Sequence, residues 1–164
     1  MRETAPLSDS HTVMSEILMP NDANNLGRAL GGSVLHWMDI CAAIASRRFS
    51  RRQVVTASMD HVDFLGPIDL GDIVTVEGYV FETGRTSMDA LVNVRAERPS
   101  ENETQDTATS FFTMVALDED ERPASVPEVC CPTDEQETFR DDALRRRHKR
   151  RESLESADSP EPSV

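Results

Sequence analysis

Two adjacent glycines in this sequence could hold a reacting carbonyl group. Gly31-Gly32 opens a segment in which apolar residues recur at helical spacing. Glycines at a helix N-terminus let a ligand approach the backbone, where unpaired N–H groups and the helix dipole point toward it. Those N–H groups could stabilise an oxyanion that forms on a carbonyl. A loop-to-helix junction that only needs flexible residues would have the same sequence, so the local pattern leaves both interpretations open.

A single carboxylate in the same segment is a candidate base. Asp39 follows Trp37 and Met38 in a largely apolar run. A carboxylate among apolar neighbours is costly unless it is solvated, hydrogen-bonded or used in chemistry, and a partly exposed, hydrogen-bonded role is the more common one. Seven residues of helix separate Asp39 from Gly32, which is roughly 10 Å. A carbonyl at the glycines would therefore need a mediating water or a carboxylate from a second subunit.

An asparagine pair lies in the loop before this segment. Asn24 and Asn25 belong to a stretch rich in Asn, Asp and Gly. The amide of Asn24 could donate to a carbonyl and accept from water. Asparagine in a loop is ordinarily a turn former, and the pattern alone favours that interpretation.

Other kinds of catalytic site have no support in the sequence. The histidines share no metal-ligand spacing and form no Ser-His-Asp pattern, and no glycine loop resembles a phosphate cradle. The cysteines have no metal-site or disulfide spacing, and we expect them to be reduced thiols: Cys41, Cys130 and Cys131. The sequence therefore predicts no metal and no cofactor.

The elements that must position these residues can be predicted from apolar periodicity. Residues 31–49 have helical spacing with apolar character on most sides, which indicates a helix enclosed by other structure. Strands are predicted at residues 11–19, 54–64, 72–82, 86–98 and 106–117. One strand, one long helix and four strands joined by short turns predict an α+β domain, a five-stranded antiparallel sheet wrapped around one helix. One helix covers only one face of such a sheet, which favours a homodimer.

The two ends of the chain have a different composition. Residues 1–10 are predicted to be a flexible N-terminus and residues 11–127 the folded domain. Residues 128–164 carry few large apolar side chains, several prolines, a basic block and an acidic end. Such a segment buries too little apolar surface to offset the entropy of ordering. We therefore expect a charged, largely disordered tail, which could contain a short helix around residues 135–151.

The charge balance restricts the partners. The chain has 17 Lys plus Arg against 30 Asp plus Glu, a net charge of −13, which argues against nucleic acid. No apolar run approaches the roughly 20 residues that span a bilayer and no signal peptide is evident, so a cytoplasmic protein is expected. Lys149 is the only lysine, and with the acidic excess and few aromatics this indicates a protein adapted to concentrated salt.

Taken together, the segments resemble the hotdog-fold acyl-CoA thioesterases of the YciA and brain acyl-CoA hydrolase type. The resemblance runs from about residue 11 to residue 127 and keeps the order and spacing of every block. The residues that carry it are MPNDANNLGRALGG (19–32), LHWMD (35–39), VVTASMDHVDFLGPIDLGD (54–72), GRTSM (84–88), FTMVALD (112–118) and RPASVP (122–127).

The resemblance implies hydrolysis of acyl-CoA to free fatty acid and CoA at a dimer interface, in a homodimer or a trimer of dimers. No cofactor is implied, because CoA is part of substrate and product. By position, Asp39 matches the catalytic carboxylate, as general base or nucleophile, and Asn24 the asparagine that assists from the opposite subunit. Backbone N–H groups of Gly31 and Gly32 would bind the oxyanion. A non-catalytic hotdog module that binds acyl-CoA or regulates a partner is the alternative.

Contacts for CoA are expected from two short segments, whose guanidinium and hydroxyl groups suit phosphates and amides. They comprise Thr56, Ala57, Ser58, Arg85, Thr86 and Ser87. Phe64, Leu65 and Pro67 could line the pantetheine tunnel or simply pack at a strand end. CoA is a polyanion, so Arg85 and Arg95 are candidates to meet its phosphates. The block at residues 145–151 could also fold back to them, although a disordered tail is the favoured interpretation.

Overall fold

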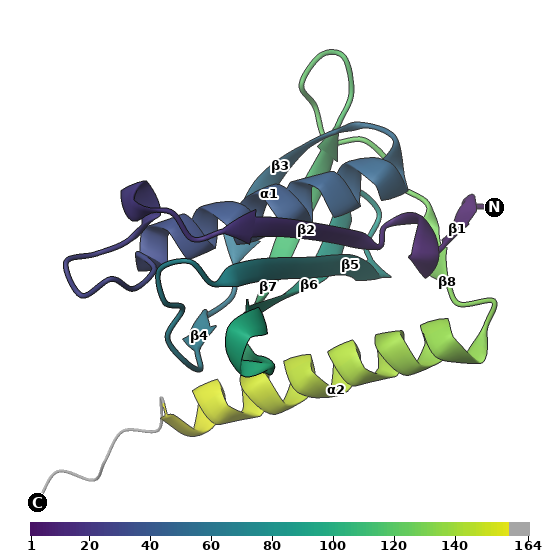
Figure 1. The fold of residues 1–164 in the computed structure, drawn as a ribbon. Helices are drawn as coiled ribbons and strands as arrows, with labels where there is room; N and C mark the ends of the chain where they lie inside the picture. Colours follow the sequence, from purple (N-terminus) through teal and green to yellow (C-terminus); the bar gives the residue numbers. More distant parts are fainter. Residues whose placement is uncertain (158–164) are drawn as a thin grey trace, which may run out of the picture.

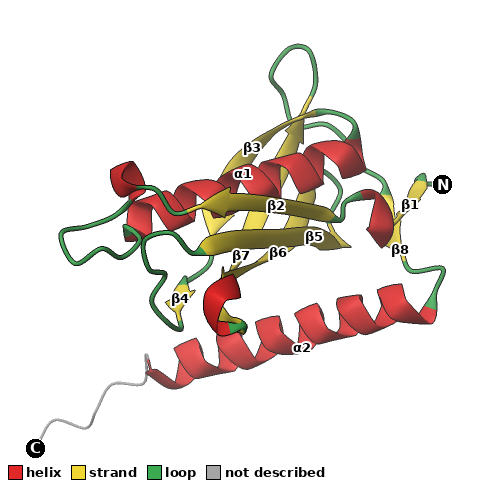
Figure 2. Ribbon diagram, viewed as in Figure 1, coloured by secondary structure: helices red, strands yellow, loops and turns green. Residues whose placement is uncertain are grey.

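One long helix lies against a curved antiparallel sheet, and a second long helix lies on the other side of the sheet (Figures 1 and 2). The structure is a computed structural model, and it describes residues 1–157. In chain order its elements are β1 (Thr4–Pro6), η1 (Leu7–Asp9), β2 (Thr12–Ile17), η2 (Pro20–Asp22), α1 (Gly31–Ser50), β3 (Gln53–Met59), β4 (Asp63–Phe64), β5 (Ile73–Thr83), β6 (Ser87–Arg98), η3 (Pro99–Glu101), β7 (Glu103–Leu117), β8 (Glu128–Cys130) and α2 (Asp134–Ala157).

The main sheet has the strand order β2-β5-β6-β7-β3, and neighbouring strands are antiparallel. This confirms the α+β hotdog architecture expected from the sequence, with five principal strands and one long helix. The predicted strand 54–64 is divided in two, because residues 60–62 leave the ladder. Strand β4 then pairs separately with β7.

Helix α1 packs on one face of the sheet with the stripe that the spacing predicts. Met38, Cys41 and Ala42 of this stripe are fully buried. The contact with β5 is close, because a Cβ on Gly78 would lie 2.9 Å from the Cys41 Sγ. Glycine at position 78 therefore lets the helix approach the sheet.

Helix α2 covers the opposite face of the sheet, which the sequence did not predict. The Tyr79 hydroxyl of β5 donates to the Phe139 carbonyl of α2, and the two rings meet edge to face at 5.3 Å. Farther along α2, Arg147 pairs with Asp89 of β6 at 2.7 Å and lies 5.7 Å from the centre of the Phe81 ring. Both faces of the sheet are thus covered within one protomer.

The two chain ends therefore differ from what the sequence predicted. Within residues 1–10, β1 pairs in parallel with β8, and Leu7 is buried. Residues 128–157, expected to be a largely disordered tail, contain β8 and the 24 residues of α2. The short helix expected around residues 135–151 lies within α2, which is longer than predicted. The expectation of disorder was wrong because α2 is held by aromatic and charged contacts to the sheet rather than by a broad apolar stripe. The remainder of the expected tail, residues 158–164, lies outside the described residues.

The two outer strands of the main sheet leave apolar side chains at the surface. Val55 and Met59 of β3 are 46% and 40% exposed, and Val13 and Ile17 of β2 are more exposed still. Unpaired edge strands with apolar side chains are suited to pairing with another chain. Among residues 1–157, no helix combines the length and apolar character that crossing a membrane would require.

Candidate active site

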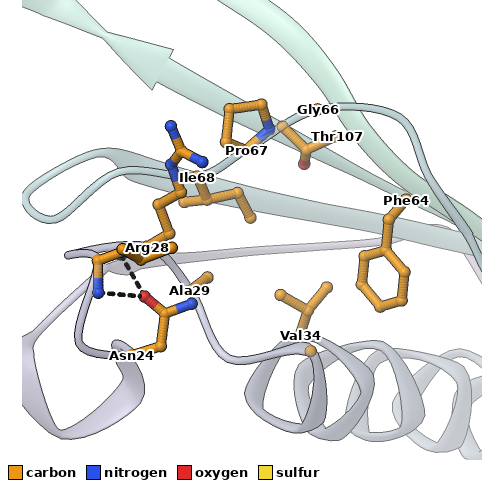
Figure 3. Close-up of a pocket in the computed structure, with 11 residues that line it drawn as sticks. Asn24, Arg28, Ala29, Val34, Phe64, Gly66, Pro67, Ile68 and Thr107 are labelled. Atoms are coloured by element: carbon orange, nitrogen blue, oxygen red, sulfur yellow. Dashed lines mark hydrogen bonds between the residues drawn. The ribbon is translucent and has the colours of Figure 1, made fainter.

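A pocket of about 320 Å³ opens at the N-terminus of α1 (Figure 3). Three segments form it: the loop before α1, the first turn of α1, and the end of β4 with the chain that follows it; β7 adds one residue. Its lining is mostly apolar and comprises Asn24, Leu26, Arg28, Ala29, Gly31, Val34, Phe64, Gly66, Pro67, Ile68 and Thr107.

The orientation of the Asn24 side chain follows from its hydrogen bonds. Its Oδ1 accepts from the backbone N–H groups of Leu26 (2.9 Å) and Arg28 (3.2 Å). The backbone N–H of Asn24 in turn donates to the Arg28 carbonyl at 2.7 Å. Because the oxygen is occupied by the loop, the amide nitrogen points toward the Ala29 and Val34 side of the pocket (Figure 3). Asn24 is therefore a turn former that also presents an N–H₂ donor to the pocket.

The first turn of α1 presents further donors. Leu30 occupies the N-cap position and supplies no side-chain cap. Within residues 1–157 the N–H groups of Gly31 and Gly32 have no acceptor. The first N–H groups of a helix lack intrahelical partners, and here no side-chain cap replaces them. A Cβ on Gly32 would have no atom within 4 Å, whereas one on Gly31 would lie 3.5 Å from the Phe64 ring. The space beside Gly32 is therefore open in the protomer.

A buried ion pair holds the loops that form the pocket. Asp72 is only 3% exposed and accepts from Arg98 Nε at 2.9 Å and from the Asp69 N–H at 2.8 Å. The hydrogen bond to Asp72 and the surrounding carboxylates raise the pKa of Arg98 above its ordinary value. Two main-chain bonds, Ala29 N–H to Ile68 and Leu70 N–H to Gly27, then join this segment to the Asn24 loop.

Asp39 lies farther along α1, beside the edge strand. Its Oδ1 accepts a 2.6 Å hydrogen bond from the Thr56 hydroxyl of β3. The bond joins a half-buried carboxylate to an exposed strand residue. Thr56, expected among the CoA contacts, therefore orients Asp39 in this protomer. Ala57 and Ser58 follow at a bulge in β3 and are exposed.

The turn between β5 and β6 is close to the same strand. Ser87 pairs with Val115, which pairs with Val55, so this turn and β3 are two strand spacings apart, about 10 Å. The carbonyls of Arg85, Thr86 and Ser87 all accept backbone hydrogen bonds. This fixes the backbone of the turn while the Arg85 side chain remains exposed.

The protomer thus separates the predicted site residues into two groups. Asn24 lies in the loop before α1, and Gly31 and Gly32 open the helix. Asp39, the ninth residue of α1, instead bonds to Thr56 of β3, the strand that also carries Ala57 and Ser58 and lies two strand spacings from the 85–87 turn. Within the described chain the pocket lining includes Asn24 and Gly31 but neither Gly32 nor Asp39. Arg95 faces neither group, because it pairs with Glu77 at 3.0 Å on the α2 side of the sheet.

The pocket lining includes residues that the sequence predicts as site residues and others that it does not. Of the three candidates for the pantetheine tunnel, Phe64 and Pro67 line the pocket, whereas Leu65 is not among its lining residues in the described chain. Val34 was predicted only as part of the buried stripe of the helix. Arg28 was not identified, although a charged residue three positions before the glycine pair is a usable signal.

The remaining reactive groups do not form a second centre. Burial raises the pKa of the Cys41 thiol to about 12, so it remains protonated and is no nucleophile at neutral pH. Across residues 1–157, no group of three or more His, Cys, Asp or Glu side chains could hold a metal ion.

Comparison with known proteins gives a consistent result. Residues 26–102 match the family model of the thioesterase superfamily. The chain is 39% identical over 149 residues to the uncharacterized acyl-CoA thioester hydrolase YkhA of Bacillus subtilis, covering 91% of this chain and 87% of that protein. A crystal structure of an apo-hexameric acyl-CoA thioesterase superposes with a TM-score of 0.82 at 37% identity, covering 93% of this chain and 97% of the other.

A second solved enzyme is similar to this chain and contains ligands. The acyl-CoA hydrolase of Staphylococcus aureus, in complex with butyryl-CoA, CoA and CoA disulfide, superposes with a TM-score of 0.79 at 34% identity, over 94% of this chain and 97% of that one. Structures of three alanine variants of that enzyme, replacing an asparagine, an aspartate and a threonine, superpose with TM-scores of 0.81, 0.79 and 0.77.

Proposed function

The chain belongs to the thioesterase superfamily and is an acyl-CoA thioester hydrolase, and from that premise we propose that it releases fatty acid and CoA at a site shared between two subunits. Asp39 supplies the base or nucleophile, and Asn24 of the opposite subunit assists. The observation that carries the proposal is the Asn24 side chain, whose oxygen is bound by the loop and whose amide donor lies beside the helix N-terminus. The Asn24 amide and the N–H groups at the start of α1 are donors suited to the oxygen of a thioester carbonyl as it becomes an oxyanion.

A shared site explains why one protomer holds the two groups apart. In a two-fold dimer, any contact between one region of a protomer and a second region of its partner occurs twice, so two incomplete halves give two complete sites. The exposed edge strand β3, with Val55 and Met59 at its surface, supports a dimer contact beside Asp39. We propose a homodimer, or a trimer of such dimers as the hexameric relative suggests.

The spacing of the candidate residues also supports their roles. The asparagine, aspartate and threonine replaced in the Staphylococcus aureus variants are separated by 15 and 17 residues. Asn24, Asp39 and Thr56 are separated by the same intervals.

The chemistry can follow either of two routes. In the first, Asp39 takes a proton from a water whose oxygen attacks the thioester carbonyl carbon. The oxyanion accepts from the Asn24 amide and from the Gly31 and Gly32 N–H groups. Collapse breaks the C–S bond, and the CoA thiolate receives the proton from Asp39. In the second, the Asp39 carboxylate attacks the carbonyl carbon itself and the C–S bond breaks, so that an anhydride forms and CoA leaves as the thiolate. Water then hydrolyses the anhydride to fatty acid and the Asp39 carboxylate, and the proton released goes to the CoA thiolate. On both routes the Thr56 hydroxyl holds the carboxylate in place.

Hydrolysis of a panel of acyl-CoAs tests the proposal directly. Released CoA is measured with a thiol reagent, with a protein-only blank because Cys130 and Cys131 are partly exposed. We expect turnover by the wild-type chain and a loss of about 10²- to 10⁴-fold in kcat for Asp39→Ala, the usual contribution of a general base. Binding of acyl-CoA without turnover would instead identify a non-catalytic module, and full activity in Asp39→Ala would overturn the assigned mechanism.

A further inference from the structure

The pocket beside Asn24 carries one charged side chain. Of the eleven residues that line it in the described chain, Arg28 is the only one with a formal charge. Its side chain extends from the Asn24 loop toward the segment that carries Pro67 and Ile68 (Figure 3). An otherwise mostly apolar pocket with one cation discriminates between ligands by the position of their negative charge.

The backbone of Arg28 is fixed, whereas its guanidinium is weakly engaged. Its N–H donates to Asn24 Oδ1 at 3.2 Å, and its carbonyl accepts from the Asn24 N–H at 2.7 Å. The Arg28 side chain is nevertheless 55% exposed, and its Nε lies 3.8 Å from the carboxylate of Asp69. That carboxylate is already bound more closely by Arg98, at 2.8 Å. A partly engaged cation on a fixed backbone can accept an anion without rearrangement of the loop.

We propose that Arg28 is a specificity-determining residue that binds an anionic group of the substrate at the Asn24 pocket. The inference rests on the proposed thioesterase function and adds the substrate chemistry that this pocket selects. The anion is either a phosphate of CoA or a carboxylate at the far end of the acyl chain. Both would pair with the guanidinium, and its planar donors suit either one.

Three substrates distinguish the two sources of the anion. Butyryl-CoA carries phosphates only, succinyl-CoA carries phosphates and a terminal carboxylate, and S-butyryl pantetheine carries neither. We expect Arg28→Gln to lower kcat/KM by about 10-fold wherever the contacted anion is present, as for loss of one partly exposed charged contact. A loss with both CoA thioesters but not with the pantetheine thioester identifies a phosphate. A loss confined to succinyl-CoA identifies the carboxylate.

Matched variants separate recognition from damage to the loop. Arg28→Lys keeps the charge and should restore most of the lost kcat/KM. Arg122→Gln is the control, because Arg122 is also exposed and its N–H is likewise bound by the side chain four residues before it, Asp118. We expect this control to match the wild type. Equal losses on all three substrates, or no loss on any, would overturn the role of Arg28, whereas failure of the wild type to hydrolyse any thioester would overturn the proposed function itself.

Discussion

Replacing Asn24 by aspartate separates the two roles of this side chain. The Oδ1 atom binds two backbone N–H groups, at 2.9 and 3.2 Å, and an aspartate keeps an oxygen in that place. It removes the N–H₂ donor and adds a negative charge that would repel the oxyanion. Asn24→Asp should therefore leave the loop intact and remove the proposed catalytic contribution.

The magnitudes follow from the bonds that each variant loses. Loss of one oxyanion donor lowers kcat by about 10²- to 10³-fold. Because the added negative charge also repels the oxyanion, kcat of Asn24→Asp should fall by at least that factor. Its free energy of unfolding should stay close to that of the wild type. Asn24→Ala loses the donor and both loop hydrogen bonds, and at about 0.5 to 1 kcal/mol for each exposed bond it should also be destabilised by about 1 to 2 kcal/mol.

The assay combines acyl-CoA turnover with urea unfolding of the same samples. Asn25→Asp is the control, because Asn25 is the exposed neighbour and receives the same change of charge. We expect the control to retain kcat within about threefold of the wild type. Retention of activity by Asn24→Asp would show that Asn24 is only a turn former. Equal destabilisation of Asn24→Asp and Asn24→Ala would refute the assigned orientation of the amide.

Other parts of the structure lead to further predictions. Gly32→Ala should fold normally, since a Cβ there meets no atom within 4 Å, but it should lower kcat if substrate approaches that backbone; unchanged kinetics would place substrate elsewhere. Thr56→Val removes the 2.6 Å bond to Asp39 and should lower kcat about 10-fold or more with little change in KM, a split that steady-state kinetics measures. Arg147→Met should destabilise the chain by about 2 to 3 kcal/mol in urea unfolding, because within residues 1–157 it leaves Asp89 with only the Thr113 hydroxyl; no change would mean that α2 is not held there. Activity and dimer stability should rise between low salt and about 1 M KCl if the acidic surface is a salt adaptation, and a maximum of both in dilute buffer would contradict that interpretation.

The central fold could be predicted because its patterns are local and strong. The stripe of apolar residues along α1 and the alternation of apolar and polar residues along β6 each indicate burial against a neighbouring layer. Helix α2 gave no such signal, since Ala143 is its only fully buried residue within the described chain. Its position depends on Arg147 meeting Asp89 and Phe81, which are more than fifty residues away in sequence. Composition cannot reveal pairings of that kind.

The candidate site was predicted less completely, for a similar reason. Asn24, Asp39 and the glycine pair could be identified because their residue types are chemically informative. The separation of Asp39 from the glycine pair follows from their positions in α1, and the interval between Asp39 and Gly32 already indicated it. Which atom of Asn24 faces the pocket could not be predicted, because it depends on the turn that Arg28 closes.

The arrangement of cations also changes how the negative charge of the chain should be understood. The basic block at residues 145–151 belongs to α2, on the face of the sheet opposite α1, and three of its arginines are engaged there. Arg146 binds Asn93 and Thr109, Arg147 binds Asp89, and Arg150 binds Asp63.

Arg28 and Arg85 are two cations that a polyanionic substrate could reach, each on a fixed backbone with an exposed side chain. A net charge of −13 opposes the approach of any polyanion, whatever its acyl group, and added salt screens that repulsion. A single positioned guanidinium instead acts on one group of the bound substrate. Salt should therefore raise kcat/KM for every CoA thioester, whereas Arg28 should change the ratio between substrates, and comparing the wild type with Arg28→Gln at one fixed salt concentration separates the two effects.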